Sequence, residues 1–318
     1  MKYRKLGKNG PEISVIGFGS WAIGGGGWAS AWGNQDDELS VESVRVAFDN
    51  GINFYDTAAV YGLGHSEEVI GKALKGFRDK VVLATKCGLV WDENKTISKN
   101  GTYESILREA EASLRRLGTD YIDLYQMHWP DTDTNAPAEE TMRALDKLVQ
   151  DGKVRYVGVS NYNVPLLEAS LSVRHVDSLQ PPYSILRPAI EKEILPFCLE
   201  KGIGVVAYSP LTSGLLSGNY SYDTKFSDDD WRSRSAAHTG EGLRKNVDRV
   251  EKLRDIANRY GITLPQLAIA YDLAHPALTS AIVGVRKPSH ILSVLPGIGV
   301  TLDEATLAEI RKIAVEEG

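Results

Sequence analysis

Short apolar runs alternate with segments of helical periodicity along almost the whole chain, and this alternation constrains the fold most strongly. The runs typical of strands cover residues 15–19, 52–55, 81–85, 121–127, 154–159, 178–180, 204–208 and 280–283. Apolar residues then recur at helical spacing in residues 41–50, 67–75, 106–117, 142–149, 164–173, 190–201, 247–260 and 289–295. Eight strand-then-helix units in 318 residues predict a closed (β/α)₈ barrel. An open doubly wound sheet has about five or six strands, so eight are a surplus for it.

Three segments lie outside these units. Asn9-Gly10, between the short runs 3–6 and 12–14, is a hairpin turn signal and predicts a hairpin that caps the barrel bottom. Residues 301–316 have the pattern of an extra C-terminal helix. The connection 211–246 is long and rich in Ser, Asp and Arg, and such connections are usually functional or mobile. Since no linker interrupts the pattern, we expect one domain over residues 1–318.

Charge and apolar content bound the classes of partner. A formal net charge of −6 argues against a general nucleic-acid surface. We expect no membrane partner either, because no apolar run reaches the ~18 to 20 residues of a membrane span. Residues 1–6 lack the apolar stretch of a secretory signal. Cys87 and Cys198 form neither a disulfide framework nor a metal pattern, so we expect a cytoplasmic protein with reduced thiols and no metal site.

Four polar residues follow the second, third and fourth strand-like runs. They are Asp56, Tyr61, Lys86 and His128. Each alone has a structural explanation, such as turn capping or packing, but a barrel brings its strand ends to one face. A tyrosine hydroxyl titrates near ~10, and a neighbouring ammonium group lowers that pKa. A carboxylate beside the lysine would keep it charged, so the set predicts a proton-donating site.

The motifs around these residues resemble the aldo-keto reductase superfamily. They are Asp56-Thr57-Ala58-x-x-Tyr61-Gly62 with Ser66-Glu67, Lys86, His128, Gly158-Val159-Ser160-Asn161, Gln180, Tyr208-Ser209-Pro210-Leu211 and Val283-Gly284-x-Arg286. The opening of the chain is similar to the bacterial branch and to the potassium-channel β-subunit branch. The resemblance implies a (β/α)₈ barrel without a Rossmann domain that reduces carbonyl groups with NADPH.

The resemblance also implies roles for individual residues. Tyr61 would donate a proton to the carbonyl oxygen, and Lys86 would lower the pKa of Tyr61. Asp56 would pair with Lys86, and His128 would orient the carbonyl group or assist proton transfer. Hydride would then reach the carbon as Tyr61 neutralises the charge developing on oxygen.

Cofactor contacts are implied along the same face. Ser160, Asn161 and Gln180 would hold the nicotinamide carboxamide, and the Tyr208 ring would stack on the nicotinamide. The remaining implied contacts are Ser20 and Trp21 in the first loop, Asp56, then Ser209, Pro210, Leu211 and Ser213 near the pyrophosphate, and Gly284, Arg286 and His290 near the adenosine phosphate. For Ser213 the alternative is an ordinary turn. Arg286 favours NADPH over NADH, because arginine forms bidentate hydrogen bonds with phosphate oxygens such as those of the adenosine 2′-phosphate.

The sequence departs from the family pattern at His290, where relatives often carry Gln, and at two further places. Ser293-Val294 stand where relatives often carry Glu-Asn, and Asn219 stands where some relatives carry a lysine. Lys225, Arg232 and Arg234 could replace that charge, or could simply be solvated.

A dinucleotide fingerprint at residues 17–22 is a false lead. It satisfies Gly-x-Gly-x-x-Gly/Ala, but that motif needs a helix at its second glycine, and the four glycines of residues 24–27 oppose one. We expect a flexible first loop beside the substrate instead. Candidate pocket walls, with core packing as the alternative, are Trp21, Trp28, Trp32, Trp91 and Trp129. Cys87 should face away from Lys86, into the helix layer.

Three functions remain open. The first is NADPH-dependent, reversible reduction of small aldehydes and ketones. The second is a cofactor-sensing regulatory subunit like the channel β subunits, although that branch commonly has Asn where this chain has His128. The third is a sugar or polyol dehydrogenase using NADP⁺. The physiological substrate, the preferred direction and the oligomeric state stay open.

Overall fold

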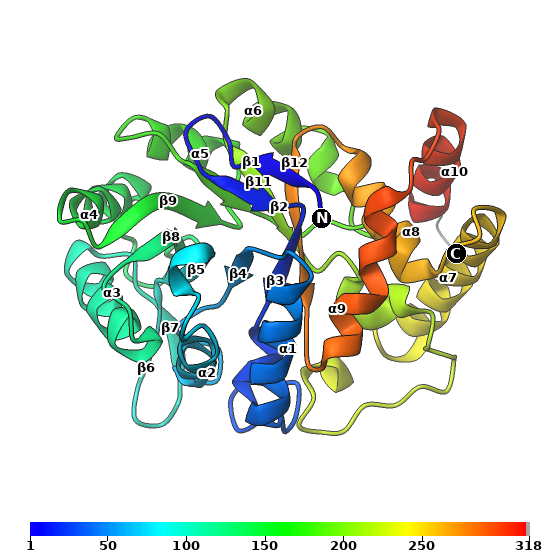
Figure 1. Ribbon diagram of the computed structural model, residues 1–318, viewed down its shortest axis with the longest axis horizontal. Coiled ribbons are helices and arrows are strands. Elements are labelled where there is room, and N and C mark those ends of the chain that lie inside the picture. The colour runs from blue at the N-terminus through cyan, green and yellow to red at the C-terminus, as the bar shows by residue number, and fades with distance from the viewer. Residues whose placement is uncertain (316–318) are drawn as a thin grey trace.

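Eight parallel strands close into a barrel in the computed structural model, which describes residues 1–315 (Figure 1). The strands are β3 (Ile16–Gly19), β4 (Phe54–Asp56), β5 (Val82–Cys87), β8 (Ile122–Met127), β9 (Val154–Ser160), β10 (Ser178–Gln180), β11 (Gly204–Tyr208) and β12 (Leu278–Gly284). Their order around the barrel is β3-β4-β5-β8-β9-β10-β11-β12, and β12 pairs with β3 to close it. The (β/α)₈ prediction is confirmed.

Helices surround the strands as an outer layer (Figure 1). They are α1 (Asp37–Asp49), α2 (His65–Ala73), α3 (Tyr103–Leu117), α4 (Ala138–Gln150), α5 (Val164–Leu171), α6 (Ile194–Lys201), α7 (Gly240–Arg259), α8 (Leu264–Ala274), α9 (Pro288–Val294) and α10 (Glu304–Val315). Short 3₁₀ turns are η1 (Trp21–Gly24), η2 (Arg78–Lys80), η3 (Ala189–Glu191), η4 (Thr212–Ser217), η5 (Trp231–Arg234) and η6 (Leu295–Gly299). Helix α3 shows why these segments are helical: Ile106, Ala110, Leu114 and Leu117 form one buried stripe, and Gly118 ends the helix in a left-handed conformation.

The expected hairpin caps the bottom of the barrel. Strands β1 (Tyr3–Lys5) and β2 (Glu12–Ser14) pair antiparallel, and Leu6 and Ile13 are fully buried in the interior cluster that contains Phe54. The turn is longer than the Asn9-Gly10 signal predicts, since the Leu6 N–H donates to the Pro11 carbonyl. Gly7 supplies its left-handed residue, with φ of 59°.

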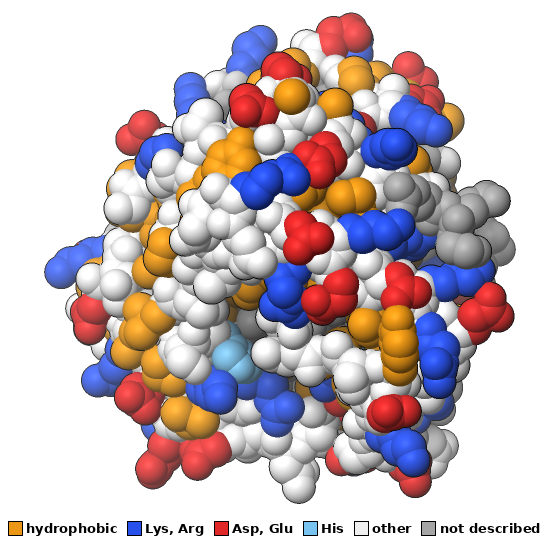
Figure 2. Space-filling model, turned by 90° about the vertical axis from the view of Figure 1, so that its right-hand side faces the viewer, with side chains coloured by type: hydrophobic (Ala, Val, Ile, Leu, Met, Phe, Trp, Pro, Cys, Tyr) orange, Lys and Arg blue, Asp and Glu red, His pale blue; other side chains and the backbone are white. Residues whose placement is uncertain are grey.

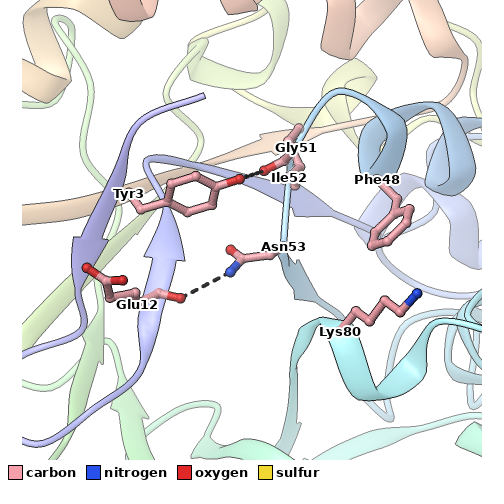
Figure 3. Close-up of a pocket in the computed structure, with 7 residues that line it drawn as sticks. All are labelled: Tyr3, Glu12, Phe48, Gly51, Ile52, Asn53 and Lys80. Carbon is pink, nitrogen blue, oxygen red and sulfur yellow. Dashed lines mark hydrogen bonds between the residues drawn. The ribbon is translucent and has the colours of Figure 1, made fainter.

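A shallow hollow lies between this hairpin and the start of β4 (Figure 3). The Tyr3 hydroxyl donates to the Gly51 carbonyl at 2.8 Å, and the Asn53 amide donates to the Glu12 carbonyl at 3.1 Å. Lys80 stands on the opposite side of the hollow. These contacts tie the hairpin to the N-terminal ends of the strands. In (β/α)₈ barrels the N-terminal ends of the strands contribute to stability, and active sites form at the C-terminal ends.

Three features depart from the expected pattern. Helix α8 was not anticipated, because it is buried on nearly every side and its sequence shows no helical period. Its signal was the capping box of Thr263 and Gln266, with Pro265 in the first turn. A second hairpin, β6 (Leu89–Trp91) with β7 (Ile97–Lys99), follows β5. In the long connection after β11, helix α7 begins at Gly240, earlier than expected.

The barrel interior changes from apolar to polar along its axis. At the bottom and centre it is filled by Leu6, Ile13, Phe54, Val82, Ala84, Leu124, Val206 and Ile282. A larger apolar cluster, which includes Cys87, fills the space between strands and helices, as expected for that thiol. At the C-terminal ends of β4, β5 and β10, the buried residues Asp56, Lys86 and Gln180 are polar. The polar end of the interior is therefore the candidate site.

The surface seen in Figure 2 carries interspersed acidic and basic side chains. This face lies on the side of α7, α9 and α10 in Figure 1. Within residues 1–315, no helix combines the length and apolar composition that a membrane crossing requires.

Candidate active site

Strands β4 and β5 bring a buried carboxylate and a buried amine together. Asp56 ends β4, and Lys86 lies near the end of β5, where strand alternation points both side chains inward. The Lys86 Nζ donates to Asp56 Oδ2 at 2.7 Å and to the Thr57 carbonyl at 2.9 Å. Lys86 is 1% exposed and Asp56 4%, so this ion pair lies out of water.

Tyr61 lies in the turn after β4, and its hydroxyl contacts the Lys86 amine. The Lys86 Nζ lies 3.2 Å from the phenolic oxygen. Gly62 has φ of 63°, and a Cβ there would lie 2.1 Å from the Gly24 carbonyl oxygen. This glycine therefore lets the turn pack directly on the first loop, which fixes the position of Tyr61. The predicted Asp56, Lys86 and Tyr61 group is thus assembled in the structure.

The charges of this group differ from one expectation. Burial, and then the negative charge of Asp56, raise the pKa of Tyr61 well above its ordinary 10.0. The net shift is upward because burial disfavours the phenolate. The lowering of this pKa by Lys86 stays a prediction. Burial also lowers the pKa of Lys86, and the charge and hydrogen bond of Asp56 oppose that lowering. Tyr61 accordingly keeps its proton at neutral pH.

His128 follows β8 and faces Tyr61. The two rings are in edge-to-face contact, with centroids 5.6 Å apart. Burial, and then the charge of Lys86, lower the pKa of His128 well below 6.5. The imidazole is therefore neutral at pH 7 and can donate one hydrogen bond to a carbonyl oxygen.

Amide and hydroxyl groups from β9, β10 and β11 complete the rim. The Asn161 amide donates to the His128 carbonyl and to Ser160 Oγ, each at 3.0 Å. The Ser160 hydroxyl donates to the Gln180 carbonyl at 2.6 Å, and the Tyr208 hydroxyl donates to Asn161 Oδ1 at 2.9 Å. The structure brings these four predicted residues together beside His128. Amide donors and acceptors of this kind suit the carboxamide of a nicotinamide ring.

The turn after β11 has an unusual backbone. Ser209, Thr212 and Ser213 have φ of 59°, 48° and 53°. Turns can direct backbone N–H groups at an anion. Here the N–H groups of Thr212 and Gly214 donate to the carbonyls of Ser209 and Leu211. Pro210 is buried here, whereas Leu211 and Ser213 are partly exposed.

Arg232 braces this turn from the long connection. Its guanidinium pairs with Asp230 and donates to the Tyr220 hydroxyl at 2.6 Å, and Tyr220 donates to the Ser213 carbonyl at 3.2 Å. This residue therefore has protein partners and is not simply solvated.

The predicted phosphate-binding arginine contacts the first loop. Arg286 Nε donates to Gln35 Oε1 at 2.8 Å, and its other nitrogens donate to the carbonyls of Trp32 and Asn34. The His290 imidazole accepts a hydrogen bond from the Arg286 backbone at 3.4 Å. Gly284 is exposed at the end of β12. Arg286 thus joins the eighth loop to the first.

The first loop contributes aromatic rings and one buried hydroxyl. The rings of Trp21 and Trp28 lie 6.3 and 6.4 Å from that of Tyr61, whereas Trp32 packs edge-on against Trp231. Ser20 is fully buried, and its hydroxyl contacts Ser66 at 2.8 Å. The side chain of Ser20 therefore serves the loop's own network. Helix α1 begins only at Asp37, which agrees with rejecting the dinucleotide fingerprint.

Sequence reasoning missed three residues of this end of the barrel. Trp231 stacks on Trp21 at 5.6 Å, and Gln35 holds Arg286. Neither position has a local signal, because both lie in irregular loops. Gln126 donates to Asp56 Oδ1 at 3.4 Å. Its signal was a polar residue two positions before His128, hence on the same face of a buried strand.

Comparisons with known proteins agree along the whole chain. Residues 15–315 match the model of the Aldo/keto reductase family. The aldo-keto reductase YhdN of Bacillus subtilis (strain 168) is 37% identical over 98% of this chain and 93% of the relative. An Escherichia coli (strain K12) protein named NADH-specific methylglyoxal reductase is 36% identical over 99% of this chain and 98% of its own length. The solved glycerol dehydrogenase AKR11B4 from Gluconobacter oxydans has a TM-score of 0.88 and 36% identity, covering 98% of this chain and 94% of its own.

Proposed function

The chain belongs to the Aldo/keto reductase family, and we propose that it is an NADPH-dependent enzyme that reduces aldehyde and ketone groups to alcohols, reversibly. One observation carries the proposal. The Tyr61 hydroxyl lies 3.2 Å from Lys86, which is itself paired with Asp56 at 2.7 Å. A phenol that keeps its proton beside a buried cation is suited to donate that proton as negative charge develops on a carbonyl oxygen.

The proposed reaction uses each member of the group. When bound, a reduced nicotinamide supplies hydride to the carbonyl carbon. Tyr61 gives its proton to the carbonyl oxygen, and Lys86 stabilises the phenolate that remains. Asp56 keeps the amine in place, and neutral His128 donates a hydrogen bond to the same oxygen. Positioned proton donors of this kind contribute roughly 10² to 10⁴ in rate.

We propose that Ser160, Asn161 and Gln180 hold the carboxamide and that Tyr208 stacks on the nicotinamide. Hydrogen bonds join the Ser160 and Asn161 side chains, the Gln180 backbone carbonyl and Tyr208 beside His128, which supports the assignment. The left-handed turn at Ser213 would receive the pyrophosphate. We propose no direct contact for the Ser20 side chain, since it is buried against Ser66.

The preference for NADPH over NADH is a separate proposal. Arg286 supports it, because a 2′-phosphate oxygen could replace the loop carbonyls that its guanidinium now binds. Lys287 adds an exposed positive charge next to it. The Escherichia coli relative carries the name NADH-specific, so the preference needs its own measurement.

A second candidate function is oxidation of a small polyol with NADP⁺. The likeness to a solved glycerol dehydrogenase favours it. The same residues serve this direction when Tyr61 begins deprotonated and takes a proton from the alcohol.

The direct test is cofactor turnover by the purified protein. NADPH consumption with an aldehyde panel, and NADP⁺ reduction with a polyol panel, would be followed by absorbance. We expect turnover of small aldehydes, whereas a lack of turnover on both panels would contradict the proposal. We also propose a cytoplasmic location, which cell fractionation would test.

A further inference from the structure

We propose that Gln126 is a positioning residue for Asp56, and through it for Lys86 and Tyr61. Gln126 lies on β8, is fully buried, and directs its side-chain amide at the Asp56 carboxylate. This inference rests on the proposed carbonyl reduction and adds a fifth residue to the group that performs it.

Both oxygens of the buried Asp56 carboxylate are occupied. Oδ2 accepts from Lys86 at 2.7 Å. Oδ1 accepts from the Gln180 amide at 2.8 Å and from the Gln126 amide at 3.4 Å. A buried carboxylate is costly unless donors satisfy it, and the two amides do so without adding charge. The carboxylate is therefore held from β5, β8 and β10 at once.

Strand register places Gln126 where it can reach Asp56. It pairs directly with Lys86 on β5 and with Gly158 on β9, and paired residues in register point to the same face. A Cβ on Gly158 would lie 3.0 Å from Gln126 Cγ, closer than ordinary contact. The glycine thus leaves space on one side of the Gln126 stem, and the amide extends into the barrel toward Asp56.

Packing alone does not explain a glutamine at this position. Within residues 1–315 the Gln126 Oε1 has no hydrogen-bond partner, so the residue buries a polar atom there. An aliphatic side chain would fill similar space without that cost. The Gln126 amide therefore serves the contact with Asp56. The N–H of this amide must face the Asp56 carboxylate, because the amide carbonyl would repel the carboxylate.

The role follows from the charges around Asp56. The ionisable groups facing it or Lys86 are Tyr61 from the loop after β4, His128 after β8, Tyr208 on β11 and Glu67 on α2. Burial disfavours the Lys86 cation, so its charge depends on an ionised and correctly placed Asp56. Gln126 stabilises that ionised form, whereas Gln180 also lies at the rim proposed to bind the nicotinamide. Changing Gln126 therefore isolates the positioning effect.

The test compares two variants with one control. Gln126→Met removes the N–H donor at similar volume, and Gln126→Glu places a titratable group there. Ser178→Ala is the control, because Ser178 is also buried, pairs with Gly158, and its hydroxyl has no hydrogen-bond partner within residues 1–315. NADPH oxidation with benzaldehyde gives kcat, fluorescence titration gives the NADPH Kd, and circular dichroism gives the melting temperature.

We expect Gln126→Met to lower kcat about tenfold and to leave the NADPH Kd within about twofold. Ser178→Ala should leave both values unchanged. For Gln126→Glu, a protonated acid can donate to Asp56 as the amide does, whereas the ionised acid repels it. The ratio of variant to wild-type kcat should therefore rise severalfold between about pH 8 and about pH 6.

The outcomes separate this inference from the proposed function. A wild-type protein that reduces no carbonyl contradicts the proposed function. An active wild type with an unchanged Gln126→Met variant overturns the positioning role alone. If Gln126→Met does not fold, the Gln126→Glu ratio decides: a rise at low pH supports the role, and a flat ratio overturns it.

Discussion

The Lys86 amine lies 3.2 Å from the Tyr61 hydroxyl although burial disfavours the charged form of both groups. Burial keeps the proton on the phenol until negative charge develops next to it. The amine is then already in place, so no solvent has to reorganise.

Removing the Lys86 charge should slow the reaction strongly while NADPH still binds. In Lys86→Met the phenolate has no cation beside it and Asp56 is left unpaired, so we expect kcat to fall by about 10² or more. NADPH affinity should change far less, because the proposed carboxamide ligands Ser160 and Asn161 remain. Steady-state kinetics and fluorescence titration measure the two effects. Equal losses in kcat and affinity would count against this role.

The two reaction directions should differ in their dependence on pH. Reduction needs protonated Tyr61, and burial raises the pKa of this residue well above 10.0. The kcat for reduction should therefore stay level from about pH 6 to about pH 9. Oxidation needs the phenolate, so its kcat should rise with pH across that range. His128 should cause no inflection near its ordinary pKa of 6.5, because burial lowers that pKa. An inflection near that pH, abolished in His128→Gln, would contradict the neutral imidazole.

Two variants separate phosphate binding from loop attachment. Arg286→Leu should weaken NADPH binding about tenfold or more and NADH binding much less, because only NADPH carries the 2′-phosphate. Gln35→Ala removes the side chain that Arg286 contacts at 2.8 Å, and it should change both affinities by a similar factor. Fluorescence titration with both cofactors measures this. Equal effects of Arg286→Leu on the two cofactors would rule out the phosphate contact.

Glu109 on α3 should make stability fall as pH rises. Burial raises its pKa from 4.5 to about 7, although it accepts hydrogen bonds from the Gly88 N–H and Ser105. Between these values the folded protein holds a proton that the unfolded chain has lost, so the free energy of unfolding decreases through this window. Above about 7 the decrease from this group ends. Urea unfolding at several pH values gives the free energy of unfolding as a function of pH. Glu109→Gln should flatten the decrease between pH 4.5 and about 7. An unchanged slope in this variant would refute the role of Glu109.

The fold could be predicted because each strand of the barrel leaves a local signal. Even β10, with three residues, follows the expected pattern. Helix α8 could not be found from periodicity, since nearly every side of it is buried. The proposed catalytic group was predictable because Asp56, Lys86 and His128 lie at strand ends that a closed barrel must bring together.

Interactions that depend on loop conformation or burial could not be predicted. The contacts of Trp231 and Gln35 join loops that are distant in sequence. The pKa of Tyr61 was expected to fall, whereas burial raises it. The sequence does not show how far the phenol is removed from water. The contact of the Ser20 hydroxyl with Ser66 has no signal in the sequence either.

The most direct test of the central claim is the rate of NADPH oxidation with benzaldehyde in Tyr61→Phe. The variant removes one hydroxyl, and Tyr3→Phe is its matched control, because the Tyr3 hydroxyl bonds to Gly51 at the opposite end of the barrel. We predict that Tyr61→Phe loses about 10² or more in kcat and still binds NADPH, while Tyr3→Phe keeps the wild-type rate. A wild-type rate in Tyr61→Phe would contradict the account.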